Sequence, residues 1–235
     1  MLVSAFVLSI MAGGVQPAWI SLPGSNGPVV VSPVRIELGE GPEGAALTLP
    51  VLLGDAGDSA VDAINEALSW ESMTGEPLEE TISTYREIER GFVGASFTVN
   101  YNEGGILDIT VTTDFYGAYP STEDHLFRFE TSTGERLAMR DLLDDSREAE
   151  LAGILDGMLQ ENIEAARGIY CDGDDDSGMY DGYSFGVEDL DRATIVGDGV
   201  QFRYDFGFPH VALAAEPEGD LFLMSQEMEP FLAVR

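Results

Sequence analysis

The most constraining feature of the sequence is a pair of apolar runs joined by a short turn near the middle of the chain. The first run spans residues 126–129, the second spans residues 137–139, and Thr131–Gly134 lies between them. Glycine at the fourth turn position can adopt the positive φ that a short hairpin with a bulge requires. A two-stranded ribbon is not stable alone, so other segments must supply further strands or helices.

Two more hairpins are predicted from glycine-containing turns between β-branched and aromatic runs. Residues 95–101 and 106–113 flank the turn Asn102–Gly105. With the central hairpin they predict a four-stranded antiparallel meander. The same signature predicts a hairpin of residues 193–196 and 200–204. Shorter strands are expected at residues 34–38, 47–53 and 221–224, the second of them at a sheet edge because it contains Pro50.

Helices are predicted where apolar residues recur with helical spacing. Asp58 is a good N-cap for a short helix whose apolar face carries Val61, Ile64 and Leu68. Asp145 and Glu148 resemble a capping box that opens a longer helix. Its expected core-facing residues are Leu151, Ile154, Leu155, Met158 and Ile163, and it is expected to end at Gly168. Residues 79–90 are equally compatible with a helix and a strand.

These elements predict an α+β fold, an antiparallel sheet built as a meander of hairpins with two or more helices packed against it. Residues 34–235 are expected to form one domain with two tightly associated halves, about 34–145 and 146–235. Residues 21–33 are expected to be a linker because they are rich in Pro, Gly and Ser. Residues 1–20 are interpreted as a degenerate export signal with an apolar run too short to span a bilayer. A basic start is missing, and a buried strand is the alternative. The signal predicts an exported chain, periplasmic or extracellular.

The charge balance restricts the partners. The chain has 43 acidic residues against 11 basic ones, a formal net charge of −32, and every basic residue is Arg. Such a surface repels nucleic acid and anionic membrane surfaces, so neither is expected as a partner. Because the acids are dispersed along the chain, adaptation to high salt is favoured over complementarity to a cationic partner.

An acidic loop is the strongest candidate for a metal site. Asp172, Asp174 and Asp176 alternate as in a calcium-binding loop. The EF-hand pattern fails, because Ser177 stands where Gly is required and Tyr183 where a bidentate Glu is required. No cofactor is expected, apart from weak calcium binding at this loop.

Catalytic motifs give little support to an enzyme. The only histidines are His125 and His210; the sequence contains no G-x-S-x-G, and neither histidine has zinc-ligand spacing. A pair of catalytic carboxylates stays open as an alternative, since so many acids are present.

Aromatic residues offer the best candidates for ligand binding. The faces of Phe and Tyr rings provide large contact area at low entropic cost, although core packing is the common alternative. Tyr116 and Tyr119, beside Gly117 and Pro120, are expected to be exposed. The candidate ligand-binding residues are Tyr116, Tyr119, Phe208 and His210.

The order of these short motifs resembles a known family. The matching segments are Ala63–Asn65, Tyr101–Asn102 with Gly105–Leu107, Gly117–Pro120, Phe129 with Thr133–Glu135 and Leu137, Asp141–Leu143, Gly199–Phe202, and Gly219. The chain resembles the extracytoplasmic domain of unknown function found in RsiV-type anti-sigma factors, which are lysozyme receptors, and in PdaC-type peptidoglycan deacetylases. The sequence departs from that family around Phe208–His210 and at Ala214 and Ala215, where the family usually has tyrosines.

The resemblance implies an α+β domain that contacts the cell envelope. The expected function is that of an exported, non-catalytic binding domain for peptidoglycan or a lysozyme-like protein, so its partner would be an envelope glycan or a secreted protein. The alternative is a polysaccharide-acting hydrolase, or another enzyme of the envelope associated with deacetylases.

Overall fold

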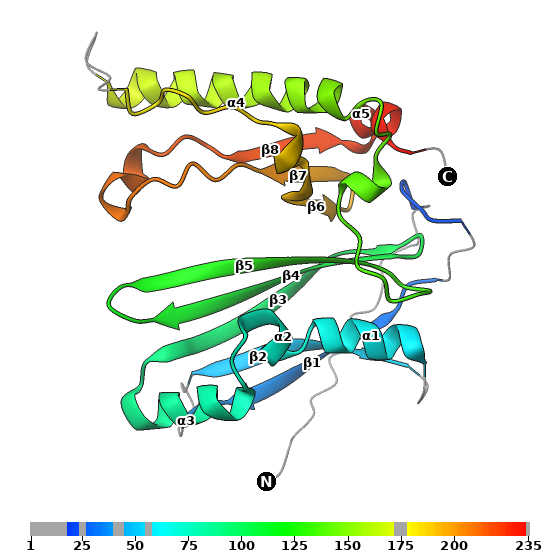
Figure 1. Ribbon diagram of the computed structural model, residues 1–235, viewed down its shortest axis with the longest axis vertical. Coiled ribbons are helices and arrows are strands. Elements are labelled where there is room, and N and C mark those ends of the chain that lie inside the picture. The colour runs from blue at the N-terminus through cyan, green and yellow to red at the C-terminus, as the bar shows by residue number, and fades with distance from the viewer. Residues whose placement is uncertain (1–17, 24–26, 40–44, 55–57, 172–177, 234–235) are drawn as a thin grey trace. The chain divides into compact units, whose positions relative to one another are not determined.

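Two compact units make up the fold, residues 1–137 and 138–235. The computed structural model describes residues 18–23, 27–39, 45–54, 58–171 and 178–233. Each unit combines helices with a β-sheet, and the sheets are mostly antiparallel (Figure 1). The predicted α+β class is therefore confirmed.

The first unit is built on a five-stranded sheet in the order β1-β2-β3-β4-β5. Its strands are β1 (Val30–Glu37), β2 (Ala46–Leu53), β3 (Gly91–Glu103), β4 (Ile106–Tyr116) and β5 (Pro120–Glu130). All neighbours are antiparallel except β2 and β3, which pair in parallel at Ala46 with Gly94 and at Leu47 with Ala95. A parallel pair needs a crossover. Three helices supply it, namely α1 (Ser59–Ala67), α2 (Trp70–Thr74) and α3 (Leu78–Ile88).

The helix α1 forms as the sequence predicts. The Asp58 carboxylate accepts hydrogen bonds from the backbone N–H groups of Ala60 and Val61, which closes the first turn. Ile64 and Leu68 then pack into a buried cluster with one face of β4 and β5. The strand residues of that cluster are Leu52 of β2 and Leu107, Ile109, Val111, Phe127 and Phe129 of β4 and β5.

The ambiguity of residues 79–90 is resolved in favour of a helix. In α3, Leu78, Ile82 and Tyr85 recur every three or four residues and pack on a cluster that includes Leu47 and Trp70. Helical spacing places these side chains on one face, where burial stabilises them, and a strand would send Ile82 and Tyr85 to opposite faces.

The predicted four-stranded meander is wrong in its last strand. The three strands β3, β4 and β5 form the meander, and β5 runs from Pro120 rather than from Leu126. After the turn the chain pairs with β5 at one bridge only, between Phe129 and Arg136. It then leaves the sheet: Asp141 accepts a hydrogen bond from Ala138 N at 2.7 Å, and a 3-10 helix, η1 (Arg140–Leu142), begins.

The strand β2 is not a sheet edge, contrary to the prediction. It lies between β1 and β3, but its pairing with β3 ends at Leu47, before Pro50 is reached. Pro50 stands opposite Pro33 of β1, so two residues without a backbone N–H face each other across one pair. Strand β1 also begins at Val30, inside the predicted linker.

A short segment before β1 packs against the β3–β4 turn. Ile20 and Leu22 are buried, and Leu22 N donates to the Gly104 carbonyl oxygen at 2.8 Å. Gly104 and Gly105 have φ of 60° and 79°, which suits a two-residue hairpin turn. A Cβ on Gly104 would clash with the Ile20 carbonyl oxygen, so glycine permits this close approach.

The second unit consists of a long helix and a three-stranded antiparallel sheet in the order β6-β7-β8. The strands are β6 (Ala193–Val196), β7 (Gly199–Arg203) and β8 (Asp220–Met224), and the first two form the predicted hairpin. The helix α4 (Glu148–Tyr170) runs along this sheet (Figure 1). The smaller elements are η2 (Val187–Asp191), η3 (His210–Ala215), α5 (Ser225–Met228) and η4 (Glu229–Phe231).

The buried face of α4 differs slightly from the prediction. Leu151, Leu155 and Ile163 are buried as expected, and Leu159 is buried with them. Ile154 is 42% exposed, so its inclusion in the core-facing stripe was wrong. Steps of four residues carry the buried stripe through Leu151, Leu155, Leu159 and Ile163, and Ile154 points away from it.

The predicted capping box of Asp145 and Glu148 is wrong as well. Arg147 is the N-cap of α4 and makes no side-chain cap hydrogen bond. Glu148 instead accepts hydrogen bonds from Arg140 Nε at 2.9 Å and Nη2 at 2.7 Å, a contact that raises the pKa of Arg140. The side chain and backbone N–H of Ser146 both donate to Asp144, which lowers the pKa of that carboxyl.

Among the described residues, no helix combines the length and the apolar character needed to cross a membrane.

Candidate functional site

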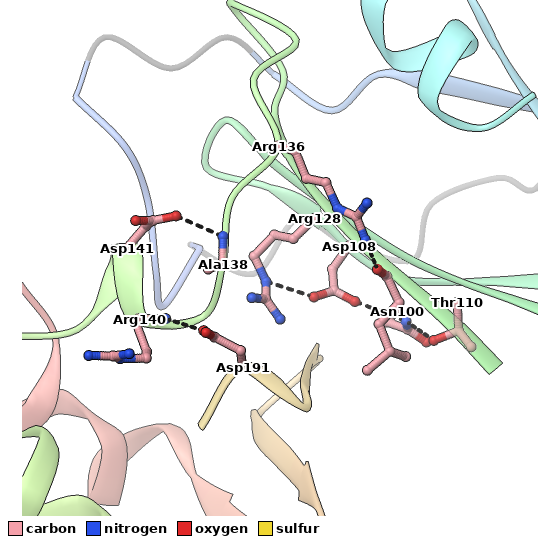
Figure 2. Close-up of polar contacts among 10 residues, drawn as sticks. Asn100, Asp108, Thr110, Arg128, Arg136, Ala138, Arg140, Asp141 and Asp191 are labelled. Carbon is pink, nitrogen blue, oxygen red and sulfur yellow. Dashed lines mark hydrogen bonds and ion pairs between the residues drawn. The ribbon is translucent and has the colours of Figure 1, made fainter. Parts of the chain in front are cut away.

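The β4–β5 hairpin carries a row of polar contacts on the face opposite the core cluster. Asp108 accepts from Arg128 Nε at 2.9 Å and from Asn100 Nδ2 at 3.0 Å, while Asn100 also donates to Thr110 (Figure 2). The side chains of Asp108 and Arg128 are 2% and 4% exposed. A buried ion pair adds little net stability over apolar residues of the same size, but removing one partner would leave an uncompensated buried charge. We therefore assign this network a structural role.

Further along the hairpin, threonine hydroxyls donate hydrogen bonds to aspartate carboxylates on the same face. Thr112 donates to Asp124 at 2.7 Å, and Thr122 donates to Asp114 at 2.8 Å. Each contact joins β4 to β5 at or next to a paired position. These cross-strand hydrogen bonds stabilise the hairpin as far as its tip, the turn of residues 117–119.

The tip of this hairpin presents the tyrosines predicted from the sequence. Tyr116 ends β4 and is 46% exposed, and Tyr119 in the turn is 77% exposed. Gly117 fits closely beside them, since a Cβ at this position would lie 2.9 Å from the Phe115 ring. Phe115 is itself 40% exposed. The name tip patch is used here for four exposed side chains, those of Phe115, Tyr116 and Tyr119 at this tip and of Ile88 at the end of α3.

A groove of about 310 Å³ adjoins this patch. It lies where α3 passes the beginning of β3 and the end of β4, and Ile88, Phe115 and Tyr116 belong to both the patch and the groove. The remaining lining residues are Glu76, Glu80, Thr81, Thr84, Arg90, Gly91, Phe92 and Gly117. We name it the α3 groove. Its wall combines aromatic rings, two carboxylates and one guanidinium.

The aromatic wall of the groove is continuous with the core. Trp70 and Phe92 meet edge to face with ring centroids 4.9 Å apart, and Phe92 and Phe115 meet in the same way at 5.3 Å. Trp70 is buried and Phe115 is exposed, so the three rings extend from the interior to the surface. Edge-to-face contacts fix ring orientation, which makes the wall a preorganised surface.

The two other predicted ligand residues belong to the second unit. Phe208 is 9% exposed and packs among the rings of Tyr180, Tyr183 and Phe206. Burial in this cluster raises the pKa of Tyr180, whose hydroxyl donates to the Ala215 carbonyl oxygen. His210 begins η3. A ligand role for Phe208 and His210 stays a prediction.

The predicted metal residues Asp172, Asp174 and Asp176 lie outside the described residues. Within the described ranges, no group of three His, Cys, Asp or Glu side chains is placed to hold a metal ion. His125 Nε2 lies 3.2 Å from the Thr113 hydroxyl oxygen. This contact joins two neighbouring strands and includes neither a nucleophilic thiol nor a carboxylate.

Sequence reasoning missed most of the groove. Glu76, Glu80 and Phe92 were not singled out, because residues 79–90 could be read as helix or strand and the groove exists only once α3 packs beside β4. The missed signal was the spacing of Glu80, Thr84 and Ile88, which places all three on one helical face.

The fold is similar to two crystal structures of DUF3298 family proteins, the RsiV and PdaC type of domain. One, from Pseudomonas aeruginosa PAO1, has a TM-score of 0.54 and 14% sequence identity over 89% of this chain and 96% of that chain. The other, from Bacteroides fragilis, has a TM-score of 0.55 and 14% identity over 89% of this chain and 95% of that chain. No family model and no curated protein matches the sequence. The resemblance seen in the sequence is therefore confirmed at the level of fold.

Proposed function

We propose that this chain is an exported, non-catalytic binding domain that contacts the cell envelope through the tip patch and the α3 groove. The observation that carries the proposal is the exposure of three aromatic rings, Phe115, Tyr116 and Tyr119, on a hairpin stabilised by cross-strand hydrogen bonds. Large apolar rings held on a rigid element and left exposed are typical of binding surfaces, since contact costs little conformational entropy.

The proposed ligand is peptidoglycan or a lysozyme-like protein. Aromatic rings stack on sugar rings, which would suit a glycan, and they also serve as anchors in protein interfaces. The likeness to DUF3298 structures is one of fold, and it leaves both ligand classes open.

A retention assay tests this proposal directly. Purified protein is incubated with insoluble peptidoglycan, and separately titrated with lysozyme, using the wild type, Tyr116→Ala and Tyr119→Ala. Each substitution should weaken binding by about tenfold or more, the scale of a lost aromatic anchor. Tyr170→Ala is the matched control, because Tyr170 is a similarly exposed tyrosine at the end of α4.

The same assay addresses the enzymatic alternative. Retention without release of soluble fragments or acetate supports a binding domain, whereas turnover that scales with enzyme concentration supports a hydrolase or deacetylase. Binding that is unchanged in both tip variants, with their melting curves intact, would show that the tip patch is not the binding surface.

A further inference from the structure

The carboxylate of Glu76, in the wall of the α3 groove, is held by hydrogen bonds that begin at a buried residue. Trp70 Nε1 donates to Thr81 Oγ1 at 2.8 Å, and the Thr81 hydroxyl donates to Glu76 Oε1 at 2.9 Å. Trp70 and Thr81 are 3% and 2% exposed. A chain of hydrogen bonds that begins at a buried indole therefore stabilises the Glu76 carboxylate at the groove wall.

The α3 groove is lined by both acidic and aromatic side chains. Glu76 precedes α3 and Glu80 lies in its first turn, whereas Arg90 follows its last turn. Phe92 meets Trp70 edge to face at 4.9 Å, and Trp70 donates to the same Thr81 hydroxyl that donates to Glu76, so the hydrogen-bond chain connects an aromatic ring of the groove wall with its carboxylate.

We propose that the α3 groove binds, at the Glu76 carboxylate, a basic side chain, an arginine guanidinium or a lysine ammonium, presented by a protein partner. The inference rests on the proposed function and selects the protein ligand over the glycan. A guanidinium can donate to the Glu76 and Glu80 carboxylates while it lies against an aromatic face, and both contacts favour a cation. A neutral sugar can donate hydroxyl hydrogen bonds to Glu76, but it lacks the positive charge that strengthens both contacts.

The charge of the whole chain supports the same partner. With a formal net charge of −32, the protein attracts cationic partners and accelerates their encounter. Long-range attraction alone would not select a particular position on the surface. The oriented carboxylate next to aromatic rings does so, because it combines charge with a fixed geometry.

An isosteric pair of small probes tests the inference. The full chain is titrated, with amide NMR shifts as the readout, using N-acetyl-arginine N-methylamide and the corresponding citrulline compound, which has nearly the same shape and no charge. The arginine probe should bind at least tenfold more tightly and shift amides of α3 and of the beginning of β3. Glu76→Gln should remove this preference, because the amide oxygen still accepts from Thr81 but the charge is lost.

Glu79→Gln is the matched control. Glu79 belongs to the same first turn of α3 and is exposed, but it does not line the groove, so the preference for arginine should persist. Equal affinity for the two probes, or an equal loss in both variants, would overturn the inference and leave only general charge attraction.

The outcome separates this inference from the proposed function. If the two probes bind with equal affinity while binding to peptidoglycan or lysozyme still depends on Tyr119, only the site for a basic side chain is refuted. Arginine binding that depends on Glu76, in a protein that retains neither peptidoglycan nor lysozyme, would refute the envelope function alone.

Discussion

Gly134 shows how a single residue limits the fold. Its φ is 77°, and a Cβ there would lie 2.7 Å from the Ala60 carbonyl oxygen and 2.9 Å from Ala63 Cβ. The glycine of the central turn therefore meets two requirements, a left-handed backbone conformation and close contact with α1. The sequence predicts the first from the turn pattern, whereas the second depends on where α1 packs.

Gly134→Ala should destabilise the protein by more than the conformational penalty alone. That penalty is about 1–2 kcal/mol for an alanine in the left-handed region, and displacement of α1 adds to it. Gly75→Ala is the control, because Gly75 has a φ of 72° and a Cβ added there would have no other atom within 4 Å. Thermal or urea melts of both variants measure the difference. Equal losses of stability in the two variants would mean that α1 can move away from the added methyl group at no energetic cost.

The groove illustrates what residue patterns cannot supply. Hydrogen bonds connect Trp70 of α2, Thr81 of α3 and Glu76 of the segment between these helices. No periodicity encodes this contact, because it depends on how α2 and α3 meet. Tyr116 and Tyr119, by contrast, could be predicted, since a glycine and a proline beside them mark an exposed turn.

At the scale of elements, hairpins with glycine turns and the helix capped by Asp58 were predictable because their signals are local. The strand predicted at residues 137–139 was wrong because alternating apolar residues also suit a segment that leaves the sheet through a 3-10 turn. The parallel pairing of β2 with β3 could not be predicted either. It depends on a crossover of three helices, one of which had no decisive pattern.

The segment that precedes β1 behaves as an element of the first unit although it has no regular secondary structure. Tyr101 anchors it: the hydroxyl donates to the Ile20 carbonyl oxygen at 2.9 Å, and the ring meets Trp19 edge to face at 6.3 Å. Burial raises the pKa of Tyr101 to about 12. Ionisation of this tyrosine therefore opposes folding.

The sign of the resulting pH dependence follows from the raised pKa. In the unfolded chain Tyr101 ionises near its ordinary value of 10.0, below its value in the folded protein. Its contribution to stability is fully present below about pH 10 and is lost as the pH rises through about 12. Melts at increasing pH should show this loss.

Tyr101→Phe should reduce the alkaline loss and lower stability at neutral pH by about 1 kcal/mol, the cost of one hydrogen bond. Tyr170→Phe is the control, because Tyr170 is exposed at the end of α4. If the stability of Tyr101→Phe falls as steeply at high pH as that of the wild type, other groups cause the loss.

At the scale of the whole molecule, charge repulsion is the dominant electrostatic effect. The chain has 43 acidic residues and 11 arginines, so most carboxylates stay unneutralised even if every arginine forms an ion pair. The pairs that do form are mostly at the surface, such as Arg35 with Glu37 and Arg147 with Glu150, and such pairs contribute little. Salt weakens these pairs, but it also screens a much larger number of repulsive contacts.

The melting temperature should therefore rise as NaCl increases from low to molar concentration. The Debye length falls from about 30 Å at 0.01 M to about 3 Å at 1 M, so repulsion between neighbouring carboxylates is progressively removed. The buried pair of Asp108 and Arg128 is shielded from the solvent and should change little. Betaine at matched osmolality is the control, since it does not screen charge. A flat or falling curve in NaCl would refute adaptation to salt and would favour complementarity to a cationic partner as the reason for the acidity.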